Sequence, residues 1–131
     1  MPSVLFILTS ADKNLSGGPA GWYLPEAAHP YYILAPHATI DFASPQGPNS
    51  PLDPASIEPY KHEKPCAHFL VDEVVQSKLA NAKKLVDVDV TEYDALFYVG
   101  GHGPVIDLAF DDVNAKLASD VSAKSCIVGP P

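Results

Sequence analysis

The sequence predicts an α/β fold in which parallel strands alternate with helices in an open, doubly wound sheet. Three observations lead to this prediction. Short apolar runs recur along the chain, amphipathic stretches lie between them, and the apolar run 95–99 breaks directly into the glycine-rich stretch 100–103. Ligands bind at the carboxyl ends of strands in such sheets, so this stretch is the first candidate site. The sequence contains no internal repeat, and we expect residues 1–131 to form a single domain.

Size and charge narrow the range of functions. The chain has 131 residues, a hydrophobic content of 47% and a formal net charge of −8. An acidic chain is repelled by nucleic acids and by anionic membrane surfaces, so neither is an expected partner. No stretch approaches the ~20 apolar residues that span a bilayer. The N-terminus lacks the basic region of a secretion signal. We therefore expect a cytoplasmic protein, with the nucleus as the alternative compartment.

The first elements are predicted from hydrophobic patterning. Residues 4–8 form a continuous apolar run, typical of a strand that is covered on both faces. Over residues 21–34 the apolar side chains recur at spacings of three and four, which indicates a helix, and Pro30 should kink it or end it early. Residues 39–44 begin with β-branched side chains and are followed by Pro45, which predicts a second strand.

The middle of the chain is less regular. Residues 46–59 contain four prolines and a glycine, which predicts a long surface loop without regular structure. Residues 68–79 have helical spacing, with Asp72 and Glu73 on the solvent side. Residues 86–90 alternate valine and aspartate and form either a strand or a turn. A solvated edge explains these aspartates as well as a metal site does.

The last elements follow the same alternation. Residues 95–99 form a buried strand, and Pro104 suits the first turn of a helix because proline lacks a backbone N–H. Residues 112–124 have the pattern of an amphipathic helix with acidic residues at its N-terminus. An apolar segment that begins at Ser125 starts the final strand.

Three stretches resemble the glyoxalase III branch of the PfpI-like superfamily. They are residues 21–31 (GWYLPEAAHPY), residues 40–47 (IDFASPQG) with 52–54 (LDP), and residues 93–103 (YDALFYVGGHG). This branch contains heat-shock chaperones and glutathione-independent glyoxalases, is related to class I glutamine amidotransferases and is well represented in fungi. The resemblance implies a flavodoxin-like parallel sheet and a role in the stress response.

The resemblance also implies a reaction. Intact members convert methylglyoxal to lactate without glutathione and without a cofactor. A cysteine thiolate on a sharp strand-to-helix turn attacks the aldehyde to form a hemithioacetal, a glutamate moves protons, and backbone amides hold the oxyanion. Glu26 matches the glutamate. From the residues alone a carboxylate in a first helical turn is the favoured interpretation, and the match of the surrounding residues 21–25 reverses that preference.

The remaining family positions fall on two stretches of this sequence. The turn that faces the reacting oxygen matches Gly100, Gly101, His102 and Gly103. Without the family motif, His102 is predicted to be a turn residue rather than a catalytic one. The walls of the substrate pocket are expected to include Trp22, Tyr23 and His29, and packing in the core explains these side chains equally well.

The nucleophile is the part that this sequence does not match. In the family, Cys-His-Gly-Pro follows the next strand, whereas here Ser125 and Cys126 are followed by IVGPP and by no histidine. A strand of about five residues, some 17 Å long, must cross the sheet before the turn forms. Cys126 is therefore expected at the opposite edge from the pocket and is a weak candidate nucleophile. The resemblance implies a class I glutamine amidotransferase-like domain that is incomplete at its C-terminal half.

Cys66 lies between His62 and His68, a combination that suggests a zinc site. The spacing matches no closed zinc pattern and four ligands are not evident, so we expect no metal and place Cys66 at a loop-to-helix junction. Without a secretion signal, Cys66 and Cys126 are expected to be free thiols.

Three functions follow from these expectations. The first is a shortened glyoxalase III-family protein with little activity toward a small aldehyde. The second is a chaperone-like or partner-binding protein, including a homodimer formed through an exposed sheet edge or apolar face. The third is an active enzyme whose site is completed by another chain or by Cys126.

Overall fold

A computed structural model describes residues 2–13, 16–100 and 127–128. Its sheet has five strands in the order β3-β2-β1-β4-β5, and every neighbouring pair is parallel. The strands are β1 (Ser3–Ile7), β2 (Thr39–Ser44), β3 (Lys83–Lys84), β4 (Ala95–Tyr98) and β5 (Ile127–Val128). The chain moves outward from β1 to β2 and then returns to the other side of β1 for β4. Without the two-residue β3, this order is that of a flavodoxin-like sheet, and it confirms the predicted parallel α/β fold.

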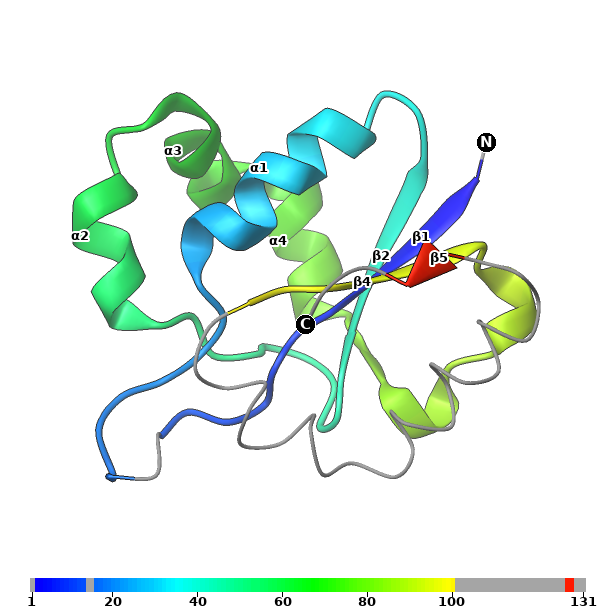
Figure 1. The fold of residues 1–131 in the computed structure, drawn as a ribbon, viewed down its shortest axis with the longest axis horizontal. Helices are drawn as coiled ribbons and strands as arrows, with labels where there is room; N and C mark the ends of the chain where they lie inside the picture. The colour runs from blue at the N-terminus through cyan, green and yellow to red at the C-terminus, as the bar shows by residue number, and fades with distance from the viewer. Residues whose placement is uncertain (1, 14–15, 101–126, 129–131) are drawn as a thin grey trace.

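Helices cover one face of the sheet (Figure 1). The α-helices are α1 (Leu24–Leu34), α2 (Ile57–Tyr60), α3 (Lys64–Val71) and α4 (Glu73–Ala80). The 3-10 turns are η1 (Pro54–Ser56), η2 (Leu85–Asp87) and η3 (Val90–Glu92). Among the described residues, no helix is long and apolar enough to cross a membrane.

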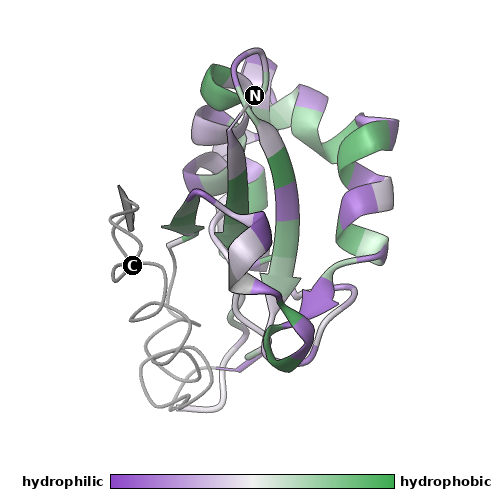
Figure 2. Cartoon of the chain, turned by 90° about the vertical axis from the view of Figure 1, so that its right-hand side faces the viewer, coloured by the Kyte–Doolittle hydropathy of each residue, from purple (hydrophilic) through white to green (hydrophobic). Residues whose placement is uncertain are grey.

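The core under the helices is rich in aromatic side chains. Phe6, on the central strand, is fully buried and lies 5.7 Å from Phe42 and 4.9 Å from Phe97, measured between ring centroids. Phe69 of α3 is also fully buried, and its ring meets four aromatic rings at centroid distances of 5.6 to 6.5 Å. In Figure 2 the strands at the centre of the molecule are coloured mainly as hydrophobic. Burial of these rings fixes α1 and α3 against the sheet.

The opposite face of the sheet holds a smaller cluster around Tyr93, which is 2% exposed. The Tyr93 hydroxyl donates a hydrogen bond to the Asp41 carboxylate at 2.8 Å and accepts one from the Lys83 ammonium at 3.3 Å. Burial, followed by the bond to Asp41, raises the pKa of Tyr93 from 10.0 to about 12, against the opposing effect of Lys83. The buried hydroxyl thus keeps its proton in the folded protein where the unfolded chain loses it.

We expect the stability of the protein to fall as the pH rises from about 10 to about 12, partly through Tyr93. In this window the folded state binds more protons than the unfolded state, and its free energy of unfolding therefore decreases with pH. The Tyr93→Phe variant should show a shallower decrease across the window when unfolding by urea is followed at several pH values. An unchanged slope would contradict the role of Tyr93.

Helix α1 begins at Leu24 rather than at residue 21, and it ends at Leu34, the last residue of the predicted pattern. Pro30 was expected to kink the helix or to end it early, and the helix does not end there. Pro30 costs one backbone hydrogen bond. Ala28 and Tyr31 are buried on either side of it, and this burial outweighs the lost bond.

The predicted helix over 68–79 is two helices, α3 and α4, which meet at Asp72. Asp72 is not simply on the solvent side. Its carboxylate accepts hydrogen bonds from the backbone N–H groups of Val74 and Val75, at 3.0 and 3.4 Å, and from the Tyr32 hydroxyl at 2.9 Å. Burial acts to raise the pKa of Asp72, and these hydrogen bonds outweigh burial and lower it. An aspartate cap thus begins a new helix inside a continuous apolar pattern.

The expectation of a loop without regular structure over residues 46–59 is wrong, because the segment contains η1 and the first part of α2, and Asp53 caps a turn there. Of the two alternatives for residues 86–90, the structure shows turns rather than a strand, and the short strand of this region is β3. Asp89 accepts hydrogen bonds from the backbone and hydroxyl of Thr91, which is the pattern of a turn residue.

Candidate functional site

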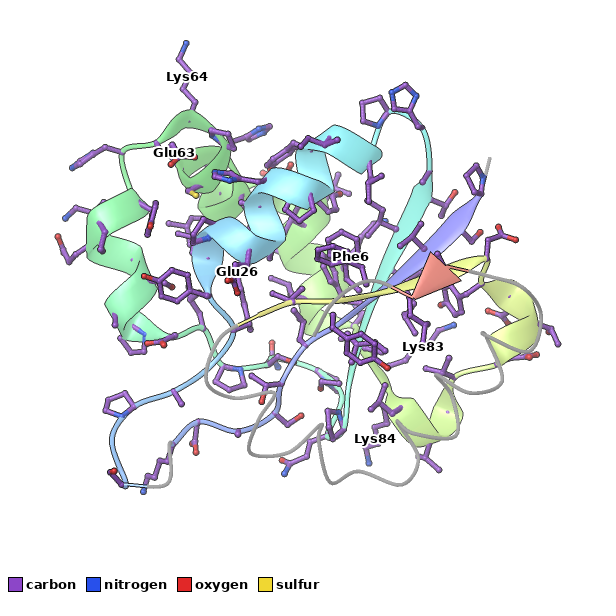
Figure 3. All side chains as sticks on the ribbon, viewed as in Figure 1. Phe6, Glu26, Glu63, Lys64, Lys83 and Lys84 are labelled. Atoms are coloured by element: carbon purple, nitrogen blue, oxygen red, sulfur yellow. The ribbon has the colours of Figure 1, made fainter. Side chains whose placement is uncertain are left out.

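The N-terminus of α1 meets the end of β4 at the point where the strand order reverses. The backbone N–H of Tyr23, the residue before α1, donates a 2.9 Å hydrogen bond to the carbonyl of Gly100. Glu26 lies in the first turn of α1. Its side chain extends from the helix toward the end of β4 (Figure 3). The structure therefore brings together two of the predicted site residues, Glu26 and Gly100.

Glu26 and Gly100 are in direct contact. A β-carbon placed on Gly100 would lie 1.8 Å from Glu26 Oε2 and 2.6 Å from its carboxyl carbon. A side chain at residue 100 and the observed position of the carboxylate therefore exclude each other. Glycine is needed here because it lets the Glu26 carboxylate lie against the backbone at the end of the strand.

An open groove of about 440 Å³ lies along α1 and β4 at this point. Its described lining consists of Pro25, Glu26, His29, Pro30, Ile33, Phe97, Tyr98 and Gly100. The lining is mainly apolar, with one carboxylate and one imidazole placed one helical turn apart. This combination suits a small ligand that has an apolar part and a group that exchanges protons.

The segment 51–56 holds the start of α1 in place. The backbone of Trp22 donates to the carbonyl of Pro51 and accepts from the N–H of Asp53, each at 2.9 Å. The Ser56 hydroxyl accepts a 3.0 Å hydrogen bond from the backbone N–H of Leu24, the first residue of α1, and donates one of 2.7 Å to the Asp53 carbonyl. The LDP motif at 52–54 thus has a structural role in positioning Glu26.

Sequence reasoning missed Ser56, although a signal for it exists. Asp53 followed by Pro54 is the pattern of a capped first helical turn. Such a turn fixes the positions of the side chains that follow the cap, including that of Ser56. The side chains of Asp53 and Ser56 are both buried.

We expect Ser56→Ala to lower the free energy of unfolding by about 1–2 kcal/mol, because it leaves the buried N–H of Leu24 without its acceptor. Urea denaturation followed by circular dichroism measures the change. Ser77→Ala, on the exposed side of α4, is the matched control and should change stability by less than about 0.5 kcal/mol. Equal effects of the two substitutions would contradict the proposed cap.

Of the three residues predicted for the pocket wall, one lines the groove and two do not. His29 lines the groove. Trp22 is 2% exposed, and its indole N–H donates to the carbonyl of Ser50 at 3.3 Å. Tyr23 is half-buried, with its ring 5.9 Å from that of Tyr60. Neither Trp22 nor Tyr23 belongs to the described lining of the groove.

The remaining predicted site residues lie outside the described part of the chain: Gly101, His102, Gly103 and Cys126. Within the described part, Cys66 lies in the first turn of α3, where the chain passes from loop to helix as expected, is fully buried and is a free thiol. Burial, and to a smaller degree the nearby Glu63, raises the pKa of this thiol. The Cys66 side chain does not line the groove.

Solved structures with a similar fold match almost all of this chain. The 24 kDa rapid encystment protein of Francisella tularensis superposes with a TM-score of 0.87 and 32% identity, over 98% of this chain and 57% of its own. Glyoxalase III from Candida albicans superposes with a TM-score of 0.83 and 28% identity, over 97% of this chain and 55% of its own. A DJ-1 superfamily protein from Agrobacterium tumefaciens, 14% identical with a TM-score of 0.54, supports the fold alone.

The chain thus spans 57% and 55% of the length of the first two solved proteins. No protein-family model matches the sequence, and no curated protein sequence matches it significantly.

Proposed function

Because this chain belongs to the glyoxalase III-like branch of the DJ-1/PfpI superfamily, we propose that it carries the glutamate of a glutathione-independent glyoxalase site. The proposed substrate is a small 2-oxoaldehyde such as methylglyoxal. The observation that carries the proposal is the contact between Glu26 and Gly100 at the strand end, inside a groove of about 440 Å³.

The chemistry assigns the proton transfers to Glu26. A thiolate adds to the aldehyde carbon, the carbonyl electron pair moves to oxygen, and that oxygen is protonated to give a hemithioacetal. Glu26 then removes the proton from the former aldehyde carbon and returns one to the former ketone carbon, while the hydroxyl proton of the hemithioacetal passes to the ketone oxygen. These two proton transfers turn the ketone into a hydroxyl and the hemithioacetal into a thioester. Water hydrolyses the thioester to lactate and releases the thiol, so the net reaction adds one water to methylglyoxal.

The thiol is the part that the described groove does not supply. None of the described residues that line the groove is a cysteine. We therefore propose that the chain of 131 residues alone turns over methylglyoxal slowly, and that Cys126 or a thiol of another chain completes the site. A partner that supplies this thiol would restore turnover without any change at Glu26.

Lactate formation from methylglyoxal tests this function. The purified chain should form lactate slowly, and Glu26→Gln should lower that rate at least tenfold, because the amide cannot take up the proton. Glu58→Gln, another exposed glutamate, is the control and should have no effect. Cys126→Ala tests whether the thiol comes from the chain itself. A rate that is the same in the Glu26→Gln variant and the unchanged chain would contradict the assignment.

The apolar lining favours a second function, binding an apolar segment of another polypeptide in a chaperone-like manner. Ile33 is 69% exposed at the edge of the groove and is available to such a segment. Suppression of aggregation of a heated client protein should be lost in Ile33→Asp and kept in Val86→Asp. Val86 is 68% exposed and does not line the groove, so it is the matched control. Equal suppression by both variants would exclude the groove as the binding surface.

A further inference from the structure

His29, which also lines the groove one helical turn from Glu26, forms a cluster with Glu63 and Cys66. His29 comes from α1, Glu63 is the residue before α3, and Cys66 is in the first turn of α3. His29 Nε2 contacts Glu63 Oε1 directly. The Cys66 sulfur lies 3.9 Å from the same nitrogen and 4.0 Å from the same oxygen. All three atoms are within 4.8 Å of one another.

This arrangement differs from that of a catalytic triad. In a triad the imidazole uses one nitrogen for the nucleophile and the other for the carboxylate. Here Nε2 of His29 faces both the carboxylate of Glu63 and the sulfur of Cys66. Three ligand atoms that converge on one point are instead the pattern of a metal site.

The two distances to the Cys66 sulfur fit a zinc ion after a small contraction, whereas His29 Nε2 and Glu63 Oε1, which are in direct contact, would have to move apart to admit the ion. Zinc binds histidine nitrogen at about 2.0–2.1 Å and cysteine sulfur at about 2.3 Å in a tetrahedron, which places these ligand atoms about 3.5 Å apart. The observed separation of 3.9 Å between His29 Nε2 and Cys66 Sγ is a few tenths of an ångström longer. Nitrogen, oxygen and sulfur ligands together suit zinc among the common divalent ions.

Burial gives the cluster a closed side and an open side. Cys66 is fully buried, whereas the side chains of His29 and Glu63 are 44% and 40% exposed. An ion held by the three would keep a fourth position toward solvent, as in zinc sites that bind water or substrate. The negative charge of Glu63 and the net charge of −8 both favour a cation.

We propose that His29, Glu63 and Cys66 bind a zinc ion with an open fourth position. The sequence did not predict this site, because it offered His62 and His68 as partners for Cys66. In the structure His68 stacks on Tyr32 at a centroid distance of 4.7 Å and lies 3.5 Å from Asp72, away from the cluster. The zinc site does not depend on the proposed glyoxalase function, and zinc binding is measured without any assay of that function.

Binding of Zn²⁺ to the metal-free chain of 131 residues tests the proposal. Calorimetry should show one equivalent of Zn²⁺, and competition with a chelator gives its affinity. Zinc binds the thiolate form of cysteine, so binding to a protonated thiol releases its proton. Titrations in two buffers that differ in ionisation enthalpy should therefore show the release of about one proton per zinc ion.

Co²⁺ serves as the spectroscopic probe of the ligands. It should produce a thiolate-to-metal charge-transfer band that is lost in both Cys66→Ser and Cys66→Ala, while Glu63→Gln and His29→Asn weaken Zn²⁺ binding at least tenfold. Cys126→Ser and His68→Ala are the matched controls and should keep the band. Circular dichroism of each metal-free variant checks that it is folded. The proposed zinc site would be wrong if the unchanged chain bound no Zn²⁺. It would also be wrong if the Co²⁺ band persisted in folded Cys66→Ala or was lost in Cys126→Ser.

Discussion

Phe69→Ala is expected to lower the free energy of unfolding by about 3–5 kcal/mol. The Phe69 ring is fully buried and contacts the rings of Trp22, Tyr31, Tyr32 and Phe42. These rings come from α1, from β2 and from the segment that leads into α1. Removal of the ring therefore leaves a cavity where α1, α3 and the sheet meet, and the surrounding rings are too large and too constrained to fill it.

Urea denaturation at several concentrations of the chain measures this loss. Val71→Ala is the control on the same helix, because Val71 is 75% exposed and should contribute less than about 0.5 kcal/mol. A cost below about 1 kcal/mol for Phe69→Ala would mean that the aromatic cluster does not hold α1 against the sheet.

Gly100→Ala is expected to move the Glu26 carboxylate and to abolish ligand binding in the groove with little loss of stability. The added β-carbon would lie 1.8 Å from Glu26 Oε2, so the two atoms cannot keep their places. The displaced atom is at the end of a flexible side chain, which moves more easily than the backbone of β4. We expect at least a tenfold loss of binding and a change in the free energy of unfolding of less than about 1 kcal/mol.

A double-mutant cycle separates this clash from other effects of the new methyl group. If Gly100→Ala acts by displacing Glu26, its effect on binding should be absent in a Glu26→Ala background, where no carboxylate remains to be moved. Additive effects of the two substitutions would show that residue 100 acts independently of Glu26.

Much of the fold could be predicted from the sequence because long apolar runs report burial directly. Residues 39–44 were expected as a strand and form β2 with the same bounds. Helix boundaries were less predictable, since they depend on single capping interactions. Asp72 ends one helix and caps the next within a continuous apolar pattern, and Tyr32, forty residues earlier in the chain, donates a hydrogen bond to it. No local pattern reveals such a partner.

The candidate site residues were also predicted only in part from the sequence. The family motif identified Glu26 and Gly100, and the structure places them in contact. The cluster of His29, Glu63 and Cys66 was missed because its members come from two helices, and the histidines nearest to Cys66 in sequence have other positions. Spacing along one helix predicts neighbours on that helix, whereas packing between α1 and α3 decides which side chains meet.

The most direct test of the central claim is a nuclear magnetic resonance titration of the ¹⁵N-labelled chain with hydroxyacetone. This ligand has the three-carbon skeleton of methylglyoxal but lacks the aldehyde, so it binds without being converted. We predict saturable shifts of the backbone amides of Glu26 and Gly100, and we expect these shifts to be absent in Gly100→Ala. Two results would contradict the assignment of the groove as the substrate site. One is a titration in which neither amide shifts, and the other is a set of shifts that persists in full in Gly100→Ala.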